Sequence, residues 1–285
     1  MVLKLDRRLA QEAARAALDE DLGSGDVTTL AVVPEGVDTR GIIHSKEEGV
    51  LAGVEVAREV FAAVDERLRF CALKQDGEKL LPGDIIAEVQ GEARSILQGE
   101  RVALNFLQRL SGIATLTARC VERVKNCPVR IVDTRKTTPG LRALEKYAVR
   151  AGGGFNHRFG LYDAVLIKDN HIKMAGGITE AVKRARQNVS PLLKVEVEVE
   201  TLEQLEEALA AGADVIMLDN MPVPLLREAV AKAKGKGVLL EASGGITEEN
   251  LEAVASTGVD FISLGMLTHS ARALDISLDL ERVKK

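Results

Sequence analysis

Cationic side chains gather in one part of this chain. Arg135 and Lys136 stand side by side in the stretch DTRKTTPGLR, after the apolar run 129–132 and Thr134. Arginine can bind a carboxylate or phosphate through two parallel hydrogen bonds, and lysine adds a point charge. A solvated turn would also explain this pair, and a core histidine would explain His157. With Arg158 and Lys168 added, the set favours a pocket for a substrate with several phosphates or carboxylates.

Acidic side chains alternate along the run LKVEVEVE. Glu196, Glu198 and Glu200 share one face of a strand, because successive side chains point to opposite faces. Carboxylates on a buried strand repel one another unless cations or a metal ion compensate them. Asp219, which ends the next apolar run, is the expected neighbour. Oxygen ligands without a Cys/His cluster favour Mg²⁺ over zinc, and Glu200 is better explained as a cap or surface group.

Two glycine-containing loops indicate a phosphomonoester site. Glycine lets the backbone approach an anion closely, and a helix N-terminus adds N–H groups and a favourable dipole. The first loop precedes a predicted helix over residues 247–256, and the second follows the last apolar run. Two ordinary turns would look similar, but barrel phosphate sites commonly use the last two such loops. The six residues are Ser243, Gly244, Gly245, Ser263, Leu264 and Gly265.

These residues must be positioned by a regular alternation of strands and helices. Short apolar strands are predicted at 129–134, 163–170, 193–200, 214–220, 237–245 and 260–265. Amphipathic helices are predicted at 178–189, 202–212, 222–237 and 247–258. Such alternation predicts a parallel sheet, whose carboxyl-end loops carry catalytic groups. Because a complete α/β barrel needs eight units, we expect an incomplete barrel, with a doubly wound open sheet as the alternative.

The first part of the chain has a different pattern. Helices are predicted at 9–18 and 100–110, and strands at 39–45, 67–73, 84–89 and 93–97. This is typical of an antiparallel sheet with helices. We expect two domains, 1–112 and 113–285, with the C-terminal tail able to return to the first domain.

Composition excludes several classes of function. The net charge of −5 and 3% aromatic residues argue against nucleic-acid binding. Three cysteines without a C-x-x-C pair suit a reducing cytoplasm and indicate neither a disulfide framework nor a zinc site. No apolar run approaches the roughly 20 residues that span a bilayer, and the N-terminus lacks a signal-peptide pattern. We expect a soluble cytoplasmic protein with no membrane partner.

The run DTRKTTPGLRALEKYAVRAGGGFNHRFGLYDAVLIKDNHI closely resembles the signature of the quinolinate phosphoribosyltransferase family. The similarity continues through GERVALNFLQRLSGIAT, KVEVEVE, IMLDN, EASGGI and SLGMLTHS, and more loosely through LDEDLGSGDVTT and GVLAG. The resemblance implies an N-terminal α/β sandwich and an incomplete α/β barrel of the type II phosphoribosyltransferase class. It also implies the reaction of quinolinate with phosphoribosyl pyrophosphate to nicotinate mononucleotide, pyrophosphate and CO₂ in de novo NAD synthesis, with substrate-bound Mg²⁺ and no organic cofactor.

The same resemblance implies roles for the candidate residues. Arg135, His157 and Arg158 would hold the two quinolinate carboxylates, with Thr134 beside them. Lys136 would reach phosphate, and Lys168 would lie between pyrophosphate and quinolinate. Glu198 and Asp219 would hold the ribose hydroxyls and Mg²⁺, and the two glycine loops the 5′-phosphate. Arg101 would reach the partner's site in a homodimer, whereas by itself it is better explained as a surface arginine paired with Glu100.

Other functions compete with this one. Lys168 could form a Schiff base, as in barrel lyases, although the many neighbouring cations argue against it. A paralogue of the same fold could use another acceptor. A sensor could bind phosphate ligands without turnover. His171 is evenly balanced between site and structure, and His44 and His269 are expected to be structural.

Overall fold

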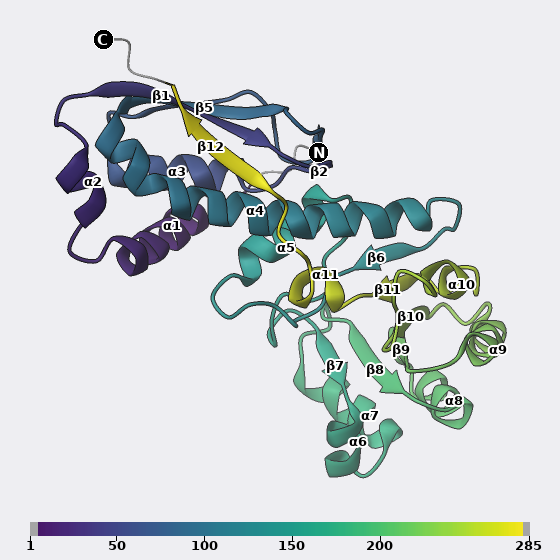
Figure 1. The fold of residues 1–285 in the computed structure, drawn as a ribbon. Coiled ribbons are helices and arrows are strands. Elements are labelled where there is room, and N and C mark those ends of the chain that lie inside the picture. Colours follow the sequence, from purple (N-terminus) through teal and green to yellow (C-terminus); the bar gives the residue numbers. More distant parts are fainter. Residues whose placement is uncertain (1–4, 282–285) are drawn as a thin grey trace. The chain divides into compact units, whose positions relative to one another are not determined.

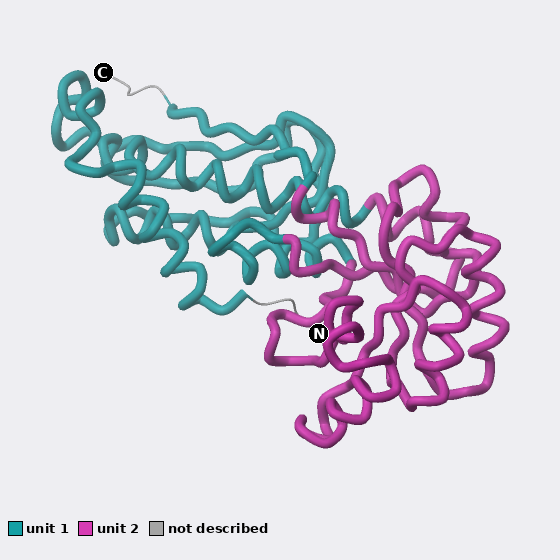
Figure 2. The backbone as a smooth tube through the Cα atoms, turned by 90° about the horizontal axis from the view of Figure 1, so that it is seen from below, with its two compact units in different colours: residues 1–118, 137–153, 270–285 teal, residues 119–136, 154–269 magenta. Residues whose placement is uncertain are grey.

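The computed structural model describes residues 5–281, which form two compact units (Figure 2). The first unit comprises Met1–Ala118, Thr137–Gly153 and Ser270–Lys285, and the second comprises Arg119–Lys136 and Gly154–His269. In the described part of the chain, no helix has both the length and the apolar character needed to cross a membrane.

The first unit is built around a four-stranded antiparallel sheet in the order β12-β1-β5-β3 (Figure 1). These strands are β12 (Ile276–Leu280), β1 (Asp38–Ser45), β5 (Ile85–Glu92) and β3 (Arg69–Ala72). Ile43 faces Leu278 on one side and Ala87 on the other, and all three side chains are buried. The strands predicted near 39–45, 67–73 and 84–89 are therefore confirmed. A two-stranded sheet of β2 (Gly49–Val50) and β4 (Lys79–Leu80) adds to the unit.

The described helices of this unit are α1 (Arg7–Leu22), α2 (Val27–Val32), α3 (Val54–Val64), α5 (Arg142–Ala151) and the long α4 (Ala93–Arg123), which continues into the second unit. Asp6 caps α1 by accepting a hydrogen bond from the Arg8 N–H. The spacing of Ala10, Ala14 and Leu18 buries one stripe of α1, and the helix packs against α3.

The strand predicted over 93–97 and the start of the predicted helix at Glu100 are both wrong. Helix α4 begins at Ala93 and continues to Arg123. Ile96, Ala103 and Leu107 are fully buried at helical spacing. The helical period therefore starts before residue 97, and burial of this stripe outweighs the strand preference of a short window.

The C-terminal segment lies along α4 before it reaches the sheet. The Leu274 N–H donates to the Gln108 carbonyl at 2.9 Å, and Gln108 Nε2 donates to the Ile276 carbonyl at 2.7 Å. A Cβ on Gly112 would stand 2.0 Å from the Arg272 carbonyl oxygen, so only glycine allows this approach. Strand β12 then pairs with β1.

The second unit contains six parallel strands in the order β6-β11-β10-β9-β8-β7 (Figure 1). In chain order they are β6 (Arg130–Val132), β7 (Val165–Ile167), β8 (Val195–Val199), β9 (Val215–Asp219), β10 (Leu239–Ser243) and β11 (Phe261–Ser263). Strands from β7 to β11 each lie beside the next one in the chain, and β6 lies beside β11. This is the strand order of a barrel that is open between β6 and β7. The predicted incomplete barrel is therefore confirmed, because a doubly wound sheet would reverse the direction of its strand order partway across the sheet.

The connecting helices are α6 (Asp169–Ala175), α7 (Ile178–Asn188), α8 (Leu202–Ala210), α9 (Val223–Ala233), α10 (Leu251–Ala255) and α11 (Met266–His269). Helices α7, α8 and α9 of this unit confirm predicted helices, α10 is shorter than predicted, and α6 and α11 were not predicted. The helix predicted over 247–256 is confined to α10. The Thr247 N–H is bound by the Asn250 side chain at 2.9 Å, which makes a turn before the helix begins.

Candidate active site

The predicted site residues of the second unit lie at or near the carboxyl ends of its strands. Because all six strands are parallel, these ends meet at one edge of the sheet. Taken along the chain from β6 to β11, they include Lys136, Lys168, Glu198, Asp219, Ser243 and Ser263. Arg101 is the exception, since it is an exposed residue of α4 in the first unit.

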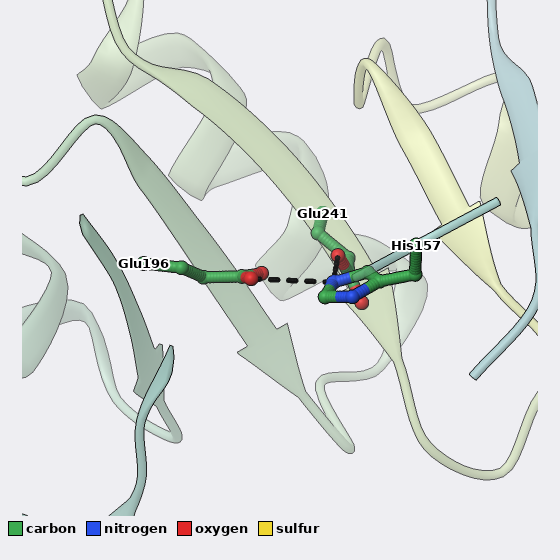
Figure 3. Close-up of side chains that lie close together, drawn as sticks. All are labelled: His157, Glu196 and Glu241. Carbon is green, nitrogen blue, oxygen red and sulfur yellow. Dashed lines mark hydrogen bonds and ion pairs between the residues drawn. The ribbon is translucent and has the colours of Figure 1, made fainter. Parts of the chain in front are cut away.

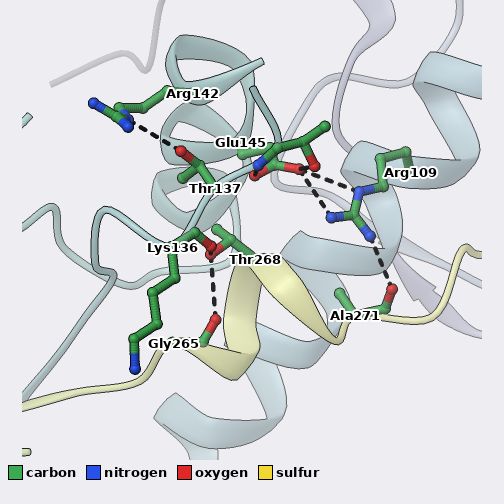
Figure 4. A network of polar contacts seen from close by, with 9 residues as sticks. Arg109, Lys136, Thr137, Arg142, Glu145, Gly265, Thr268 and Ala271 are labelled. Carbon is green, nitrogen blue, oxygen red and sulfur yellow. Dashed lines mark hydrogen bonds and ion pairs between the residues drawn. The ribbon is translucent and has the colours of Figure 1, made fainter. Parts of the chain in front are cut away.

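The segment after β6 is held in a defined conformation. The Thr268 hydroxyl donates to the Lys136 carbonyl at 2.7 Å (Figure 4). The Lys136 N–H donates to the Thr134 hydroxyl at 3.0 Å. A Cβ on Gly265 would meet Lys136 Cδ at 2.9 Å and His269 Nε2 at 3.0 Å. The lysine stem therefore lies against the glycine at the end of β11. Arg135 and Lys136 are both exposed, so their charged ends can meet a ligand.

A buried aspartate holds the segment that carries His157. Asp133 is fully buried. Its carboxylate accepts the His157 backbone N–H at 2.9 Å and Asn156 Nδ2 at 2.5 Å. The strand that leads to Arg135 is therefore tied to the segment that leads to Arg158.

The His157 ring lies between two buried glutamates (Figure 3). Its Nε2 is 3.2 Å from a Glu196 oxygen and 3.1 Å from a Glu241 oxygen. Its Nδ1 accepts the Arg158 backbone N–H at 2.7 Å. An accepting Nδ1 has no proton, so we assign the ring proton to Nε2, where it faces the carboxylates.

Two groups of this cluster, His157 and Glu241, have shifted pKa values. Burial disfavours the charged imidazole, but the hydrogen bonds to Glu196 and Glu241 outweigh burial and raise the pKa of His157. For Glu241, burial disfavours the charged carboxylate and therefore raises the pKa of the carboxyl group. A doubly protonated ring would carry a proton on Nδ1, where the Arg158 N–H points, so the Nδ1 contact and the raised pKa favour different protonation states of His157. One oxygen each of Glu196 and Glu241 has no hydrogen-bond partner among the described residues.

His157, Glu196 and Glu241 are also residue types that bind metal ions, and their ligand atoms lie within 4.8 Å of one another. A metal bound at Nε2 would require the ring proton on Nδ1. The Arg158 N–H points at that nitrogen. The contacts therefore favour a hydrogen-bonded cluster over a metal centre.

Arg158 and Arg135 lie close enough to influence each other. Burial lowers the pKa of Arg158, the Arg135 charge lowers it further, and Glu196 and Asp163 oppose the shift. One guanidinium nitrogen of Arg158 donates to the Ala164 carbonyl at 3.1 Å. Two neighbouring guanidinium groups at the strand ends favour binding of an anion with more than one charge.

Lys168 and Glu198 form an ion pair at the ends of β7 and β8. Glu198 is half-buried, whereas Glu196 is buried and Glu200 is exposed, as expected of a surface group. His171 Nδ1 accepts the Lys168 backbone N–H at 2.9 Å at the start of α6. His171 therefore caps this helix.

The end of β9 is joined to the loop after β10. Asn220, with φ 52°, donates its backbone N–H to the Ser243 carbonyl at 2.8 Å and its Nδ2 to Asp219 at 2.7 Å. Gly244 has φ 86°, and a Cβ there would stand 2.3 Å from Asn220 Oδ1. This loop borders a cavity of about 260 Å³.

The two predicted phosphate loops offer less than expected. Since α10 begins only at Leu251, Gly244 and Gly245 do not lead directly into a helix N-terminus. The Leu264 N–H donates to the Val132 carbonyl at 3.0 Å, so it is engaged within the sheet. Ser263 is buried, and its hydroxyl has no hydrogen-bond partner among the described residues. Any phosphate contact here would rely on the glycines and on serine hydroxyls.

Several buried polar residues were missed from the sequence. Glu241 lies within an apolar strand, and Asp133 directly follows one. A charged residue at such a position was the signal that could have identified both. Glu145 is fully buried and accepts hydrogen bonds from Arg109 Nη2 at 2.9 Å and from the Thr138 N–H at 3.0 Å (Figure 4). Its position on an amphipathic helix carried no comparable signal.

Comparison with known proteins gives consistent matches over nearly the whole chain. A family model described as "Quinolinate phosphoribosyl transferase, C-terminal domain" matches residues 113–279, and the model of the N-terminal domain matches residues 26–111. The chain is 53% identical to a probable nicotinate-nucleotide pyrophosphorylase [carboxylating] of Bacillus subtilis, covering 92% of this chain and 90% of that protein. It is 47% identical to the nicotinate-nucleotide pyrophosphorylase [carboxylating] of Mycobacterium leprae, with 95% and 97% covered.

Solved structures agree with these matches. The fold is similar to that of NadC from Streptococcus pyogenes, with a TM-score of 0.95 at 43% identity, covering 99% of this chain and 100% of that one. It is also similar to the nicotinate-nucleotide pyrophosphorylase from Francisella tularensis, with a TM-score of 0.94 at 43% identity and 98% of both chains covered.

Proposed function

Because the chain belongs to the quinolinate phosphoribosyl transferase family, we propose that it transfers the phosphoribosyl group of phosphoribosyl pyrophosphate to quinolinate. The products are nicotinate mononucleotide, pyrophosphate and CO₂, in the synthesis of NAD. The observation that carries this proposal is the pair of neighbouring guanidinium groups, Arg135 and Arg158, at the strand ends. A dicarboxylate offers one negative charge to each guanidinium group.

The chain's own residues can be assigned to the two substrates. Arg135, His157 and Arg158 hold the carboxylates of quinolinate, with Thr134 beside them. Lys136 and Lys168 face the phosphates and the leaving pyrophosphate. Glu198 and Asp219 hold the ribose hydroxyls. The glycines at 244, 245 and 265, with Ser243 and Ser263, border the 5′-phosphate.

Mg²⁺ fits the two half-buried carboxylates, since hard cations prefer oxygen ligands. Glu198 and Asp219 would hold it. Lys168 would then separate from Glu198 and face the incoming phosphates. When bound with phosphoribosyl pyrophosphate, the ion supplies positive charge beside the leaving group. There is no need for an organic cofactor.

The reaction follows from this charge distribution. Pyrophosphate leaves with the electron pair of its bond to the ribose carbon, and the lysines stabilise the charge that it gains. The pyridine nitrogen then forms the new bond to that carbon. The quaternised nitrogen accepts the electron pair released when the 2-carboxylate departs as CO₂, and a proton from solvent takes its place on the ring.

We further propose that the protein works as a homodimer in which Arg101 completes the partner's site. Arg101 is exposed and forms no salt bridge within the described residues, although its charge opposes the burial-driven rise in the pKa of Glu100. An exposed arginine without a salt bridge in its own chain is suited to an interface, and two-fold symmetry would place it at both sites.

A pyrophosphate-release assay with quinolinate or nicotinate as acceptor tests the function. We expect release with quinolinate only. Equal release with both would contradict the assignment of a dicarboxylate, and no release with either would favour an acceptor of another kind or a sensor. A Schiff-base role of Lys168 is disfavoured, because the ammonium that pairs with Glu198 is not the neutral amine that such chemistry needs.

A further inference from the structure

A buried carboxylate of the first unit holds a loop residue as well as an arginine. Glu145 of α5 is fully buried. Its Oε1 accepts hydrogen bonds from Arg109 Nη2 at 2.9 Å and from the Thr138 hydroxyl at 2.8 Å. Its Oε2 accepts the Thr138 backbone N–H at 3.0 Å. Both oxygens are therefore engaged, and both of them bind Thr138.

The carboxylate is itself held in place. Arg109 of α4 donates its Nη1 to the Ala271 carbonyl at 3.1 Å, while its Nη2 donates to Glu145 (Figure 4). Ala271 is buried, so the guanidinium is anchored to a buried stretch of backbone. Glu145 therefore presents its acceptors to Thr138 from a fixed position.

Filling of space does not explain this choice of residue. An apolar side chain of similar volume at a buried position is often as stabilising as a buried ion pair, because the cost of desolvating the charges offsets their attraction. What a carboxylate adds at position 145 is a pair of acceptors for Thr138, an exposed residue outside the helices and strands. The carboxylate is therefore better explained by the loop than by the helix.

This loop follows directly after Lys136. In the second unit, the fully buried Thr268 donates its hydroxyl to the Lys136 carbonyl at 2.7 Å. The chain enters the first unit at the next residue, and there Glu145 holds the Thr138 N–H. The backbone that leaves Lys136 is thus held in each unit by a fully buried side chain.

We propose that Glu145, fixed by Arg109, is a positioning residue that holds Lys136 ready for the phosphate groups of phosphoribosyl pyrophosphate through the backbone of Thr138. The proposal rests on the proposed function, which assigns Lys136 to these phosphates. The four-carbon stem of a lysine is flexible, so a fixed backbone limits the positions that its ammonium can reach. Small misplacements of a binding group are costly.

The first test measures the affinity for phosphoribosyl pyrophosphate with Mg²⁺ by calorimetry. Glu145→Gln keeps the volume but replaces one accepting oxygen with an amide donor, and Thr138→Val removes only the hydroxyl. We expect losses of about tenfold and about threefold, respectively. Quinolinate affinity should stay within about twofold, because Arg135 precedes the Lys136 carbonyl, whose own contact is unchanged. Unchanged affinity for phosphoribosyl pyrophosphate in both variants would overturn the proposal.

The second test asks whether Glu145 acts through Lys136. Lys136→Ala removes the ammonium that is to be positioned. Added to Lys136→Ala, Glu145→Gln should change the affinity for phosphoribosyl pyrophosphate by less than about twofold, because residues that act through one group are not additive. The same loss with and without Lys136 would show that Glu145 acts elsewhere.

A similar pair provides the control. Thr179 donates its N–H at 2.9 Å and its hydroxyl at 3.0 Å to Glu207. These residues belong to α7 and α8, which carry none of the candidate site residues. Glu207→Gln and Thr179→Val should leave both affinities unchanged. A loss in Glu207→Gln equal to that in Glu145→Gln would contradict a specific role.

Thermal unfolding checks that the variants remain folded. If Glu145→Gln does not fold, Thr138→Val, an exposed substitution, is compared with Thr179→Val, and equal affinities for phosphoribosyl pyrophosphate would overturn the proposal. Failure of the proposed function is recognised separately, because the wild-type protein would then bind neither substrate. Failure of this inference would leave wild-type binding intact and Glu145→Gln equal to it.

Discussion

At the scale of single residues, the candidate site separates charges that a folded chain would normally pair. Arg135 and Arg158 lie near each other, while Glu196 and Glu241 are directed at His157. Lys168 is paired with Glu198. A bound dianion would complete this arrangement, because it offsets the mutual repulsion of the two guanidinium groups.

Arg135 should therefore matter more than other arginines of the same segment. We expect Arg135→Ala to lower kcat/KM for quinolinate by about 2–5 kcal/mol of transition-state stabilisation, as for truncation of one partner of a desolvated charge pair. Steady-state kinetics with each substrate varied would measure this. Arg130→Ala is the matched control, because Arg130 is exposed on β6 and its guanidinium lies over the Phe155 ring. Similar losses in both variants would remove Arg135 from the pocket.

The two strand-end carboxylates should act on the other substrate. Glu198→Ala and Asp219→Ala are expected to weaken binding of phosphoribosyl pyrophosphate and Mg²⁺ while leaving quinolinate binding nearly unchanged. Calorimetric titration of each ligand separately would show this. Glu200→Ala, at the exposed end of the same segment as Glu198, should leave both affinities unchanged. A parallel loss of quinolinate affinity would place these carboxylates elsewhere.

At the scale of the elements, the loops after the strands are shaped by close approach of one loop to another. Gly244 lies against Asn220 after β9, and Gly265 lies against Lys136 after β6. The conformation of each loop thus depends on a strand that is distant in the sequence. Loops held in this way keep their charged groups in place without a ligand, which reduces the entropy lost on binding.

Gly244→Ala should disturb both folding and substrate use. The positive φ of 86° costs a side chain about 1 kcal/mol, and the Cβ would meet Asn220. Gly212→Ala shares the positive φ, at 80°, but has no atom within 4 Å of the new Cβ. We expect both variants to lose stability in urea unfolding, and only Gly244→Ala to raise the KM for phosphoribosyl pyrophosphate. Equal KM values would show that the Asn220 contact is not needed.

A half-buried carboxylate between two helices of the first unit should give a pH signature. Asp76 accepts the Val54 N–H of α3 at 3.1 Å and the Tyr147 hydroxyl of α5 at 2.7 Å. Burial raises the pKa of Asp76, so its ionisation opposes folding as pH rises through and above its unfolded value of about 4. Asp76→Asn should therefore gain stability relative to wild type as pH increases from about 4 to 7.

Asp84 provides a control of opposite sign. The Leu81 N–H and Lys74 lower the pKa of Asp84, so its ionisation favours folding above about pH 4 and that contribution is lost as pH falls. Asp84→Asn should lose stability at neutral pH and match wild type in acid. Urea midpoints measured at several pH values would compare the two variants, and slopes of the same sign would contradict the assignment.

At the scale of the whole molecule, the barrel residues and Arg101 belong to different units. If Arg101 serves the partner's site, Arg101→Ala and Lys168→Ala damage opposite halves of one composite site. Each variant should be inactive alone. Co-refolding them should restore about a quarter of wild-type activity, because half of the dimers are mixed and each of these has one intact site.

A second mixture provides the control. Glu198→Ala and Lys168→Ala both damage the barrel, so their mixed dimers contain no intact site and should stay inactive. Mass measurement establishes that mixed dimers formed in both experiments. If they form and the first mixture is also inactive, Arg101 acts within its own chain or has no role in the reaction.

The sequence by itself determined the class of fold and the strand ends at which the candidates lie. Hydrophobic periodicity is a local property, and it located all six barrel strands and most helices. It failed at residues 93–97, where burial along a 31-residue helix outweighed a short strand-like window. Helix α10 was likewise predicted too long, since a side-chain turn at Asn250 precedes it.

Only the tertiary structure decided which side chains meet. Glu241 and Glu196 lie 45 residues apart in the chain, yet both face His157 because β10 and β8 flank β9 in one sheet. Likewise, the Lys136 stem lies against Gly265 because β6 pairs with β11. Such contacts depend on strand order and register, which no local pattern encodes, and they determine whether the nitrogens of a histidine are available to a ligand.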